Sequence, residues 1–215
     1  MFRIALIFFG SLYFFISCKE KRVELKLPYY NTAEFSPIFI NDIDSVPIKI
    51  DHTIGVFNLK DQHNISITEK AVEGKIHVAN FFFTGCGSIC PGMMNKMRKV
   101  NSEFANANDV VFLSFSVTPW RDDVNRLNEY ATLNQIIANN WHLLTGTRNE
   151  IYDLARRSYF AEEQLGFSKD STDFLHTEHV LLVDKTGRIR GIYNGTLEID
   201  MDQLKEDIFQ LKKEN

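Results

Sequence analysis

The sequence predicts an α/β domain in which a central mixed β-sheet is flanked by helices and preceded by an N-terminal β-hairpin. Short apolar runs typical of buried strands, at 76–83, 109–117 and 180–183, alternate with segments whose apolar residues recur at helical spacing. The chain has 215 residues, of which 44% are hydrophobic and 24% charged. It is therefore long enough and apolar enough to build one domain with a sizeable core.

Turn signals and hydropathy periodicity predict the elements in order. Residues 55–59 and 65–67 alternate around a polar turn, which predicts the hairpin. The buried strand at 76–83 precedes a helix that begins at Pro91, where a missing N–H costs nothing. The later elements are a strand at 109–117, a helix at 122–140, a short strand at 141–144, a helix at 149–160, antiparallel strands at 180–183 and 189–193, and a helix at 202–213. This order is that of a thioredoxin-like fold.

The first residues have the composition of an export signal. A short positive region is followed by the apolar segment 4–16, which is too short for a transmembrane helix. The segment ends in Ser17-Cys18, which resembles a bacterial lipobox. The resemblance implies a lipoprotein signal peptide over 1–18, with Cys18 lipidated and the protein anchored to a membrane on the periplasmic side of the cell envelope. The alternative is an uncleaved signal anchor in which Cys18 is an ordinary residue.

The remaining chain divides into two parts. Residues 19–50 are polar and irregular, which predicts a tether, and residues 51–215 carry the predicted domain. The net charge of −4 leaves no basic surface for nucleic acid, so we expect no nucleic-acid partner.

The cysteine count indicates that any thiol chemistry of the domain takes place at one pair of residues. If Cys18 carries lipid, the domain retains only Cys86 and Cys90, four residues apart. A disulfide that closes so short a loop restrains the unfolded chain little, so we expect this pair to be chemical rather than structural. A small buried disulfide and two inert thiols are the structural alternatives.

The position of the two cysteines favours ionisable thiols that bind a soft metal. They lie between a buried strand and the start of a helix, whose N-terminal N–H groups and positive dipole stabilise a thiolate. Thiolates select Cu(I) and also bind zinc, whereas Cu(II) favours an added imidazole. The C-x-x-x-C spacing exceeds the redox spacing C-x-x-C by one residue, which leaves more room for an ion.

Several ordered motifs resemble those of the Sco/SenC family. The segment Phe82-Phe83-Thr84-Gly85-Cys86-Gly87-Ser88-Ile89-Cys90-Pro91 is similar to the family's C-x-x-x-C-P motif after a strand. The resemblance extends to Gly74-Lys75, to 115–122 (similar to S-V-D-P-x-R-D), to 141–146 (similar to W-x-x-L-T-G), and to His176, eight residues before Asp184.

The resemblance implies a thioredoxin-like metallochaperone that binds copper, as Cu(I) or Cu(II), through Cys86, Cys90 and His176. It implies delivery of copper to, or maturation of the copper site of, a respiratory cytochrome c oxidase. The implied partners are therefore a copper donor and a membrane cuproprotein. Three residues depart from the family pattern: Gly87 replaces a usual proline, Thr118 a usual aspartate, and Leu175 an aspartate that often precedes the histidine.

Other residues have a structural and a functional interpretation. His179 is an alternative ligand. It lies three residues after His176, so on a strand the two side chains would point to opposite faces. The methionines 93, 94 and 97 could supply thioethers, but their helical spacing favours the core. Asp122 and Asp123 could support the site through hydrogen bonds or serve as a helix N-cap and first-turn acid.

Two enzymatic functions compete with the metallochaperone. A thiol–disulfide oxidoreductase would use Cys86 and Cys90 to reduce cysteines of an oxidase subunit or another cuproprotein. His176 discriminates between the two, because a simple reductase needs no imidazole beside its cysteines. A peroxide-scavenging protein of the same fold would depend on a single peroxidatic cysteine.

Overall fold

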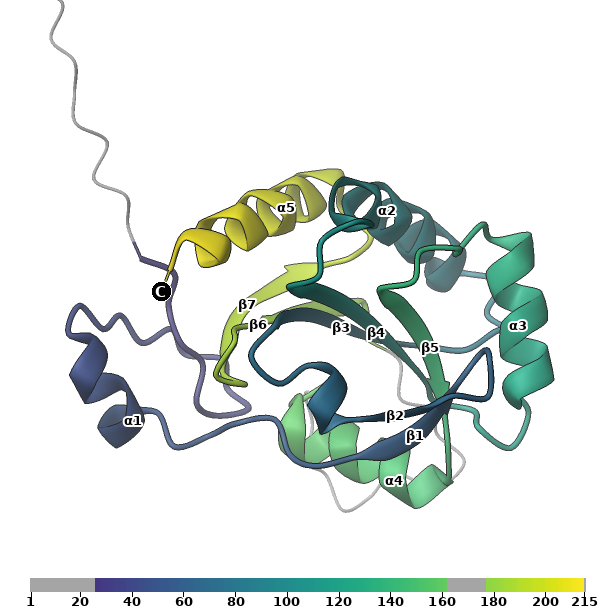
Figure 1. The fold of residues 1–215 in the computed structure, drawn as a ribbon, viewed down its shortest axis with the longest axis horizontal. Helices are drawn as coiled ribbons and strands as arrows, with labels where there is room; N and C mark the ends of the chain where they lie inside the picture. Colours follow the sequence, from purple (N-terminus) through teal and green to yellow (C-terminus); the bar gives the residue numbers. More distant parts are fainter. Residues whose placement is uncertain (1–25, 162–176, 215) are drawn as a thin grey trace, which may run out of the picture.

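A seven-stranded mixed sheet forms the centre of the protein, which we describe from a computed structural model over residues 26–161 and 177–214 (Figure 1). The strand order across the sheet is β2-β1-β5-β4-β3-β6-β7. The strands are β1 (Asn58–Asp61), β2 (Ser66–Thr68), β3 (Ile76–Phe82), β4 (Val110–Ser116), β5 (Trp141–Thr145), β6 (His179–Val183) and β7 (Ile189–Asn194).

Five α-helices accompany the sheet in the described ranges. They are α1 (Val46–Lys49), α2 (Ile89–Phe104), α3 (Val124–Leu133), α4 (Arg148–Asp153), which continues as a π-helical turn over Leu154–Ser158, and α5 (Glu198–Lys213). Short 3₁₀ turns lie at Ile43–Ser45 and Glu69–Ala71. None of these described helices is both long and apolar enough to cross a bilayer.

The pairing of β3 with β4 places the cysteine motif beside a second loop. The two strands are parallel, with Phe82 opposite Ser116, and the N–H of Val117 donates to the carbonyl of Phe82 at 2.9 Å. β4 and β5 are also parallel, whereas β6 pairs antiparallel with β3. The loops that follow β3 and β4 therefore begin at the same edge of the sheet.

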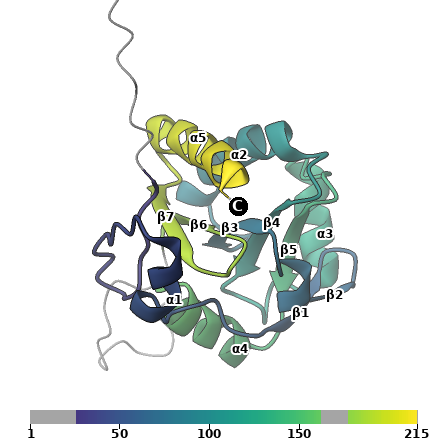
Figure 2. The same cartoon turned by 60° about the vertical axis from the view of Figure 1, so that its left-hand side comes forward.

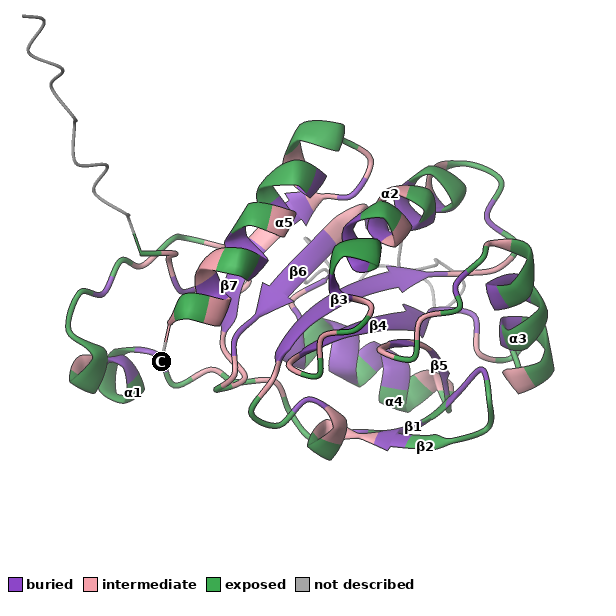
Figure 3. Ribbon diagram, turned by 45° about the horizontal axis from the view of Figure 1, so that its top comes forward, coloured by how far each residue is buried: buried purple, intermediate pink, exposed green. Residues whose placement is uncertain are grey.

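Two apolar layers cover the two faces of the sheet (Figures 1 and 3). α2, α3 and α5 pack on one face, and α4 with its π-helical turn packs on the other. Every residue of β3 and β4 is buried, as the apolar runs predict. Cys86 and Cys90 belong to the layer that contains α2, α3 and α5.

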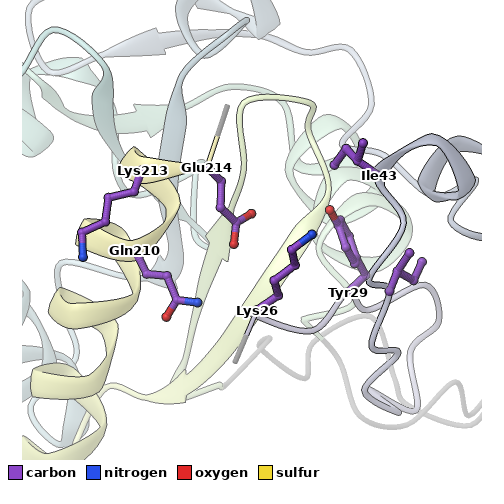
Figure 4. A pocket seen from close by; sticks show the side chains of 7 residues that line it. Lys26, Tyr29, Ile43, Gln210, Lys213 and Glu214 are labelled. Carbon is purple, nitrogen blue, oxygen red and sulfur yellow. The ribbon is translucent and has the colours of Figure 1, made fainter. Parts of the chain in front are cut away.

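Residues 26–50 lie against the β7 edge of the sheet (Figure 2). The N–H of Tyr30 donates to the carbonyl of Ile189 at 3.0 Å, and Tyr29 stacks under the guanidinium of Arg190 at 4.0 Å. Arg190 also pairs with Glu214 near the end of α5. A cavity of about 390 Å³ opens between this segment and α5, lined by Lys26, Tyr29, Ile40, Ile43, Gln210, Lys213 and Glu214 (Figure 4).

Two helix boundaries differ from the sequence-based expectation for local reasons. The helix expected over 122–140 ends at Leu133, because the backbone of Asn134 leaves the helix and Gln135 adopts a φ of 56°. The helix expected over 202–213 begins at Glu198, where Glu198 and Asp200 place negative charge at its positive end. The short helix α1 was not predicted.

Candidate functional site

The cysteine motif joins β3 to α2. Cys86 lies in the loop and its N–H donates to the carbonyl of Phe83 at 3.2 Å. Cys90 is the second residue of α2, so the helix begins two residues before the predicted start at Pro91. Because the first four N–H groups of a helix have no intrahelical acceptor, they can donate to a group in the preceding loop. Here the accepting group is the sulfur of Cys86.

The two thiols are free and buried. Cys86 is 9% exposed and Cys90 is 3% exposed. The N–H of Cys90 lies 3.5 Å from the sulfur of Cys86, whereas the side chain of Ser88, at the N-cap position, makes no capping hydrogen bond. The Cys86 sulfur thus replaces the side-chain oxygen that usually caps a helix.

The motif separates the acidities of the two thiols. Burial alone would raise the pKa of Cys86, but hydrogen bonds from the Cys90 side chain and from the N–H groups of Cys90, Ser88 and Ile89 lower it below its ordinary value. Burial, and then the neighbouring Cys86, raise the pKa of Cys90 to about 12. The pair therefore favours a thiolate on Cys86 that accepts a hydrogen bond from the Cys90 thiol.

Asp122 ties the motif loop to the loop after β4. Its carboxylate, 1% exposed, accepts hydrogen bonds from the Thr84 N–H at 3.0 Å and the Thr84 hydroxyl at 2.6 Å. It also accepts from the hydroxyls of Ser116 at 2.7 Å and Thr118 at 2.9 Å. The N-cap of α3 is Asp123, which accepts from the N–H of Arg126. Asp122 thus supports the site through hydrogen bonds, and Asp123 serves as the helix N-cap.

One face of α3 forms a wall of the site that the sequence motifs did not predict. The guanidinium of Arg126 donates to the Thr84 hydroxyl at 3.1 Å. The ring of Tyr130 packs on Phe82 with a centroid separation of 5.4 Å, in the apolar cluster that contains both cysteines. Arg126 and Tyr130 are four residues apart, which is the sequence signal for a shared helical face.

The other candidate residues lie in different places. Cys18, Leu175 and His176 fall outside the described residues. His179 points to the face of the sheet opposite the cysteines, because its neighbour Val180 packs in the cysteine-side cluster and side chains alternate along a strand. Its ring lies edge-on to Phe35 at 6.0 Å.

The three methionines of α2 are core residues, as their spacing predicts. Met93, Met94 and Met97 are at most 1% exposed and belong to the apolar cluster between α2 and the sheet. Within the described ranges, no three side chains of His, Cys, Asp or Glu are grouped closely enough to hold a metal ion. Cys86 and Cys90 are therefore the donors that the described part of the chain brings together.

A thioredoxin-like sheet with one free thiol in the loop after β3 and a second in the first turn of the helix that follows defines a thioredoxin-fold dithiol protein. The chain belongs to the SCO1/SenC family, whose model matches residues 47–213. The expected family and the expected thioredoxin-like fold are both confirmed.

Solved structures of related proteins share this fold. A SCO1/SenC family lipoprotein from Bacillus anthracis str. Ames has a TM-score of 0.66 and 25% identity, over 76% of this chain and 97% of that chain. BsSco, a member of the Sco family of cytochrome c oxidase assembly proteins with a disulfide switch, has a TM-score of 0.64 and 26% identity, over 76% and 95%. Copper-bound ScoI of Bradyrhizobium japonicum has a TM-score of 0.58 and 25% identity, over 75% and 98%.

Proposed function

We propose that this protein is a copper-binding metallochaperone of the cell envelope, which matures the copper site of a cytochrome c oxidase through Cys86, Cys90 and His176. The observation that carries the proposal is the free dithiol at the N-terminus of α2. Family membership supports it, as do the copper bound by the related ScoI and the oxidase-assembly role of the related BsSco.

The chemistry of the donor set fits copper as a cargo. Two sulfurs at a helix N-terminus are the soft, negatively charged ligands that Cu(I) prefers. An imidazole from His176 would complete the set for Cu(II). The position of the two cysteine sulfurs in a buried apolar cluster limits the access of water and oxidants to the bound ion.

The two cysteines have different parts in loading. The pKa of Cys86 lies below its ordinary value, so Cys86 offers the first thiolate to an incoming ion. Cys90 keeps its proton longer and releases it to solvent when its sulfur becomes the second ligand. Asp122 holds Thr84, and with it the start of the loop, through two hydrogen bonds that do not involve the sulfurs.

We propose further that Cys18 is lipidated and that the protein is anchored to a membrane on the periplasmic side of the envelope. The sequence Ser17-Cys18 after an apolar segment supports this location, and the related Bacillus anthracis protein is a lipoprotein. An anchor would keep the protein near a donor of copper and a membrane-bound recipient.

Copper binding by the reduced protein, expressed without residues 1–22, tests the function. We expect one tightly held copper per chain, lost in Cys86→Ser and Cys90→Ser. The thiolate-to-Cu(II) absorption band should weaken or disappear in His176→Ala. His63→Ala, in the exposed turn between β1 and β2, is the matched control and should bind like the unmodified protein. Absence of tight copper binding, or copper binding that is unchanged in Cys86→Ser and Cys90→Ser, would contradict the proposal.

A second candidate function is thiol–disulfide exchange, which the separated acidities of the two thiols favour. The Cys86 thiolate would attack a disulfide of a cuproprotein, and the Cys90 thiolate would then displace the product from the mixed disulfide. The substrate gains two electrons and two protons, and Cys86 and Cys90 become a disulfide. Copper binding that is indifferent to His176 would favour this function and make the reduction potential of the pair the next quantity to measure.

A further inference from the structure

The hydroxyl of Tyr130 is a buried polar group that the described part of the chain leaves unpaired. Tyr130 lies on α3 and is 9% exposed, and among the described residues its hydroxyl oxygen has no donor or acceptor within reach. A buried hydroxyl without a partner is costly, so natural proteins rarely keep one unless it has a role in another state.

Other buried tyrosines of the protein have partners. Tyr193 donates to Asp207 at 2.7 Å, and Tyr152 donates to the carbonyl of Val117 at 3.2 Å. The hydroxyl of Tyr159 lies 3.1 Å from Nε2 of His77. Among these four tyrosines only Tyr130 has a hydroxyl without a partner in the described ranges, although Nδ1 of His77 is also buried without one.

The surroundings of Tyr130 place it in the apolar cluster that holds both cysteines. Its ring packs on Phe82, the last residue of β3 before the cysteine motif. Burial raises the pKa of Tyr130 most, followed by the nearby Cys90 and Cys86. The polar group without a partner in the described ranges therefore shares a buried cluster with two sulfurs that lose their protons when they bind a metal cation.

We propose that the Tyr130 hydroxyl donates a hydrogen bond to a sulfur of the Cys86–Cys90 pair when that pair holds Cu(I) as a dithiolate. The inference rests on the proposed function and adds a residue to the same site. Two thiolates and one Cu(I) leave a net negative charge in a buried cluster, where a hydrogen-bond donor stabilises it strongly. In the metal-free protein the Cys86 sulfur already accepts the N–H of Cys90, and the second thiolate of the pair forms only when both sulfurs bind the ion.

The test compares Tyr130→Phe with the unmodified full chain in detergent. The variant keeps the ring on Phe82 and removes only the hydroxyl. Tyr159→Phe is the matched control, because it removes a buried hydroxyl from the opposite face of the sheet. Cu(I) affinity is measured by competition with a chromogenic chelator, and the unfolding free energy of each metal-free, reduced protein is measured in urea.

We expect Tyr130→Phe to bind Cu(I) about tenfold or more weakly, since a hydrogen bond to a charged acceptor is lost. Its metal-free stability should be unchanged or higher, because the hydroxyl has no partner there. Tyr159→Phe should bind Cu(I) like the unmodified protein. In the unmodified protein, Cu(I) should also change the tyrosine Raman doublet toward that of a hydrogen-bond donor, a readout that needs no variant.

Other results would overturn the inference. Equal Cu(I) affinity in Tyr130→Phe and the unmodified protein would do so, as would equal weakening in both tyrosine variants. A parallel loss of stability and affinity in Tyr130→Phe would show that Tyr130 is structural. If that variant does not fold, an unchanged Raman doublet in the unmodified protein decides against the inference. Failure of the unmodified protein to bind Cu(I) would overturn the proposed function itself, and the inference with it.

Discussion

Acidification should destabilise the protein through His77, which lies in the middle of the sheet. His77 is 1% exposed on β3, and burial lowers its pKa from 6.5 to about 3. The folded protein therefore holds a neutral imidazole, whereas the unfolded chain binds a proton below about pH 6.5. Because the folded pKa is the lower one, this contribution to stability is complete above pH 6.5 and is lost as the pH falls toward 3.

The size of the effect follows from the two pKa values. Each pH unit below the unfolded pKa costs about 1.4 kcal/mol until the pH reaches the folded pKa. At about pH 5 the loss from His77 alone is about 2 kcal/mol, which is a large part of the stability of an ordinary domain. Tyr159 is the polar neighbour of the imidazole, and its hydroxyl does not titrate in this range.

Urea unfolding of the metal-free, reduced protein at about pH 7.5 and about pH 5 measures this loss. His77→Gln removes the titration and keeps a polar group that can reach Tyr159. The control is His63→Gln, since His63 is exposed in the turn between β1 and β2. The unmodified protein and the control should each lose about 2 kcal/mol more on acidification than His77→Gln. An equal loss in all three proteins would refute the reasoning.

Three further predictions concern the site and its support. Cys86 should react with iodoacetamide before Cys90, on the order of 30-fold faster at about pH 8 by peptide mass spectrometry, because its thiolate is the more populated one; faster labelling of Cys90 would contradict this. Asp122→Ala should lower the unfolding free energy in urea by about 3 kcal/mol, because two buried and two part-buried donors lose a charged acceptor; a loss below about 1 kcal/mol would argue against it. Gly195→Ala should cost about 1–3 kcal/mol in the same assay, since its Cβ would lie 2.6 Å from Met93; an unchanged stability would mean that Met93 moves aside freely.

Hydropathy patterns predicted the sheet well because its central strands are buried on both faces. β3 and β4 are continuous apolar runs, and both match the expected ranges to within one residue at each end. The end of α3 was harder to predict, since the residues after Leu133 have no strong breaker, and the left-handed backbone of Gln135 ends the helix. Local propensity does not encode such a conformation in a glutamine.

The site was only partly predictable for a related reason. The cysteine pair is a contiguous motif, so its spacing and its place before a helix are visible in the sequence. The contacts around it join residues about 40 positions apart, such as Thr84 with Asp122 and Arg126. They depend on the parallel register of β3 and β4, which cannot be inferred from a single sequence. The missing partner of Tyr130 is a property of three-dimensional packing alone.

The same register gives a physical reason for one departure from the family pattern. Thr118, where an aspartate is usual, is 1% exposed and donates its hydroxyl to Asp122 at 2.9 Å. An aspartate at 118 could donate to Asp122 only in its protonated form, because two ionised carboxylates could not both stay charged in this buried place. In this chain the threonine instead supplies one of the four donors that hold Asp122, and Asp122 in turn holds Thr84.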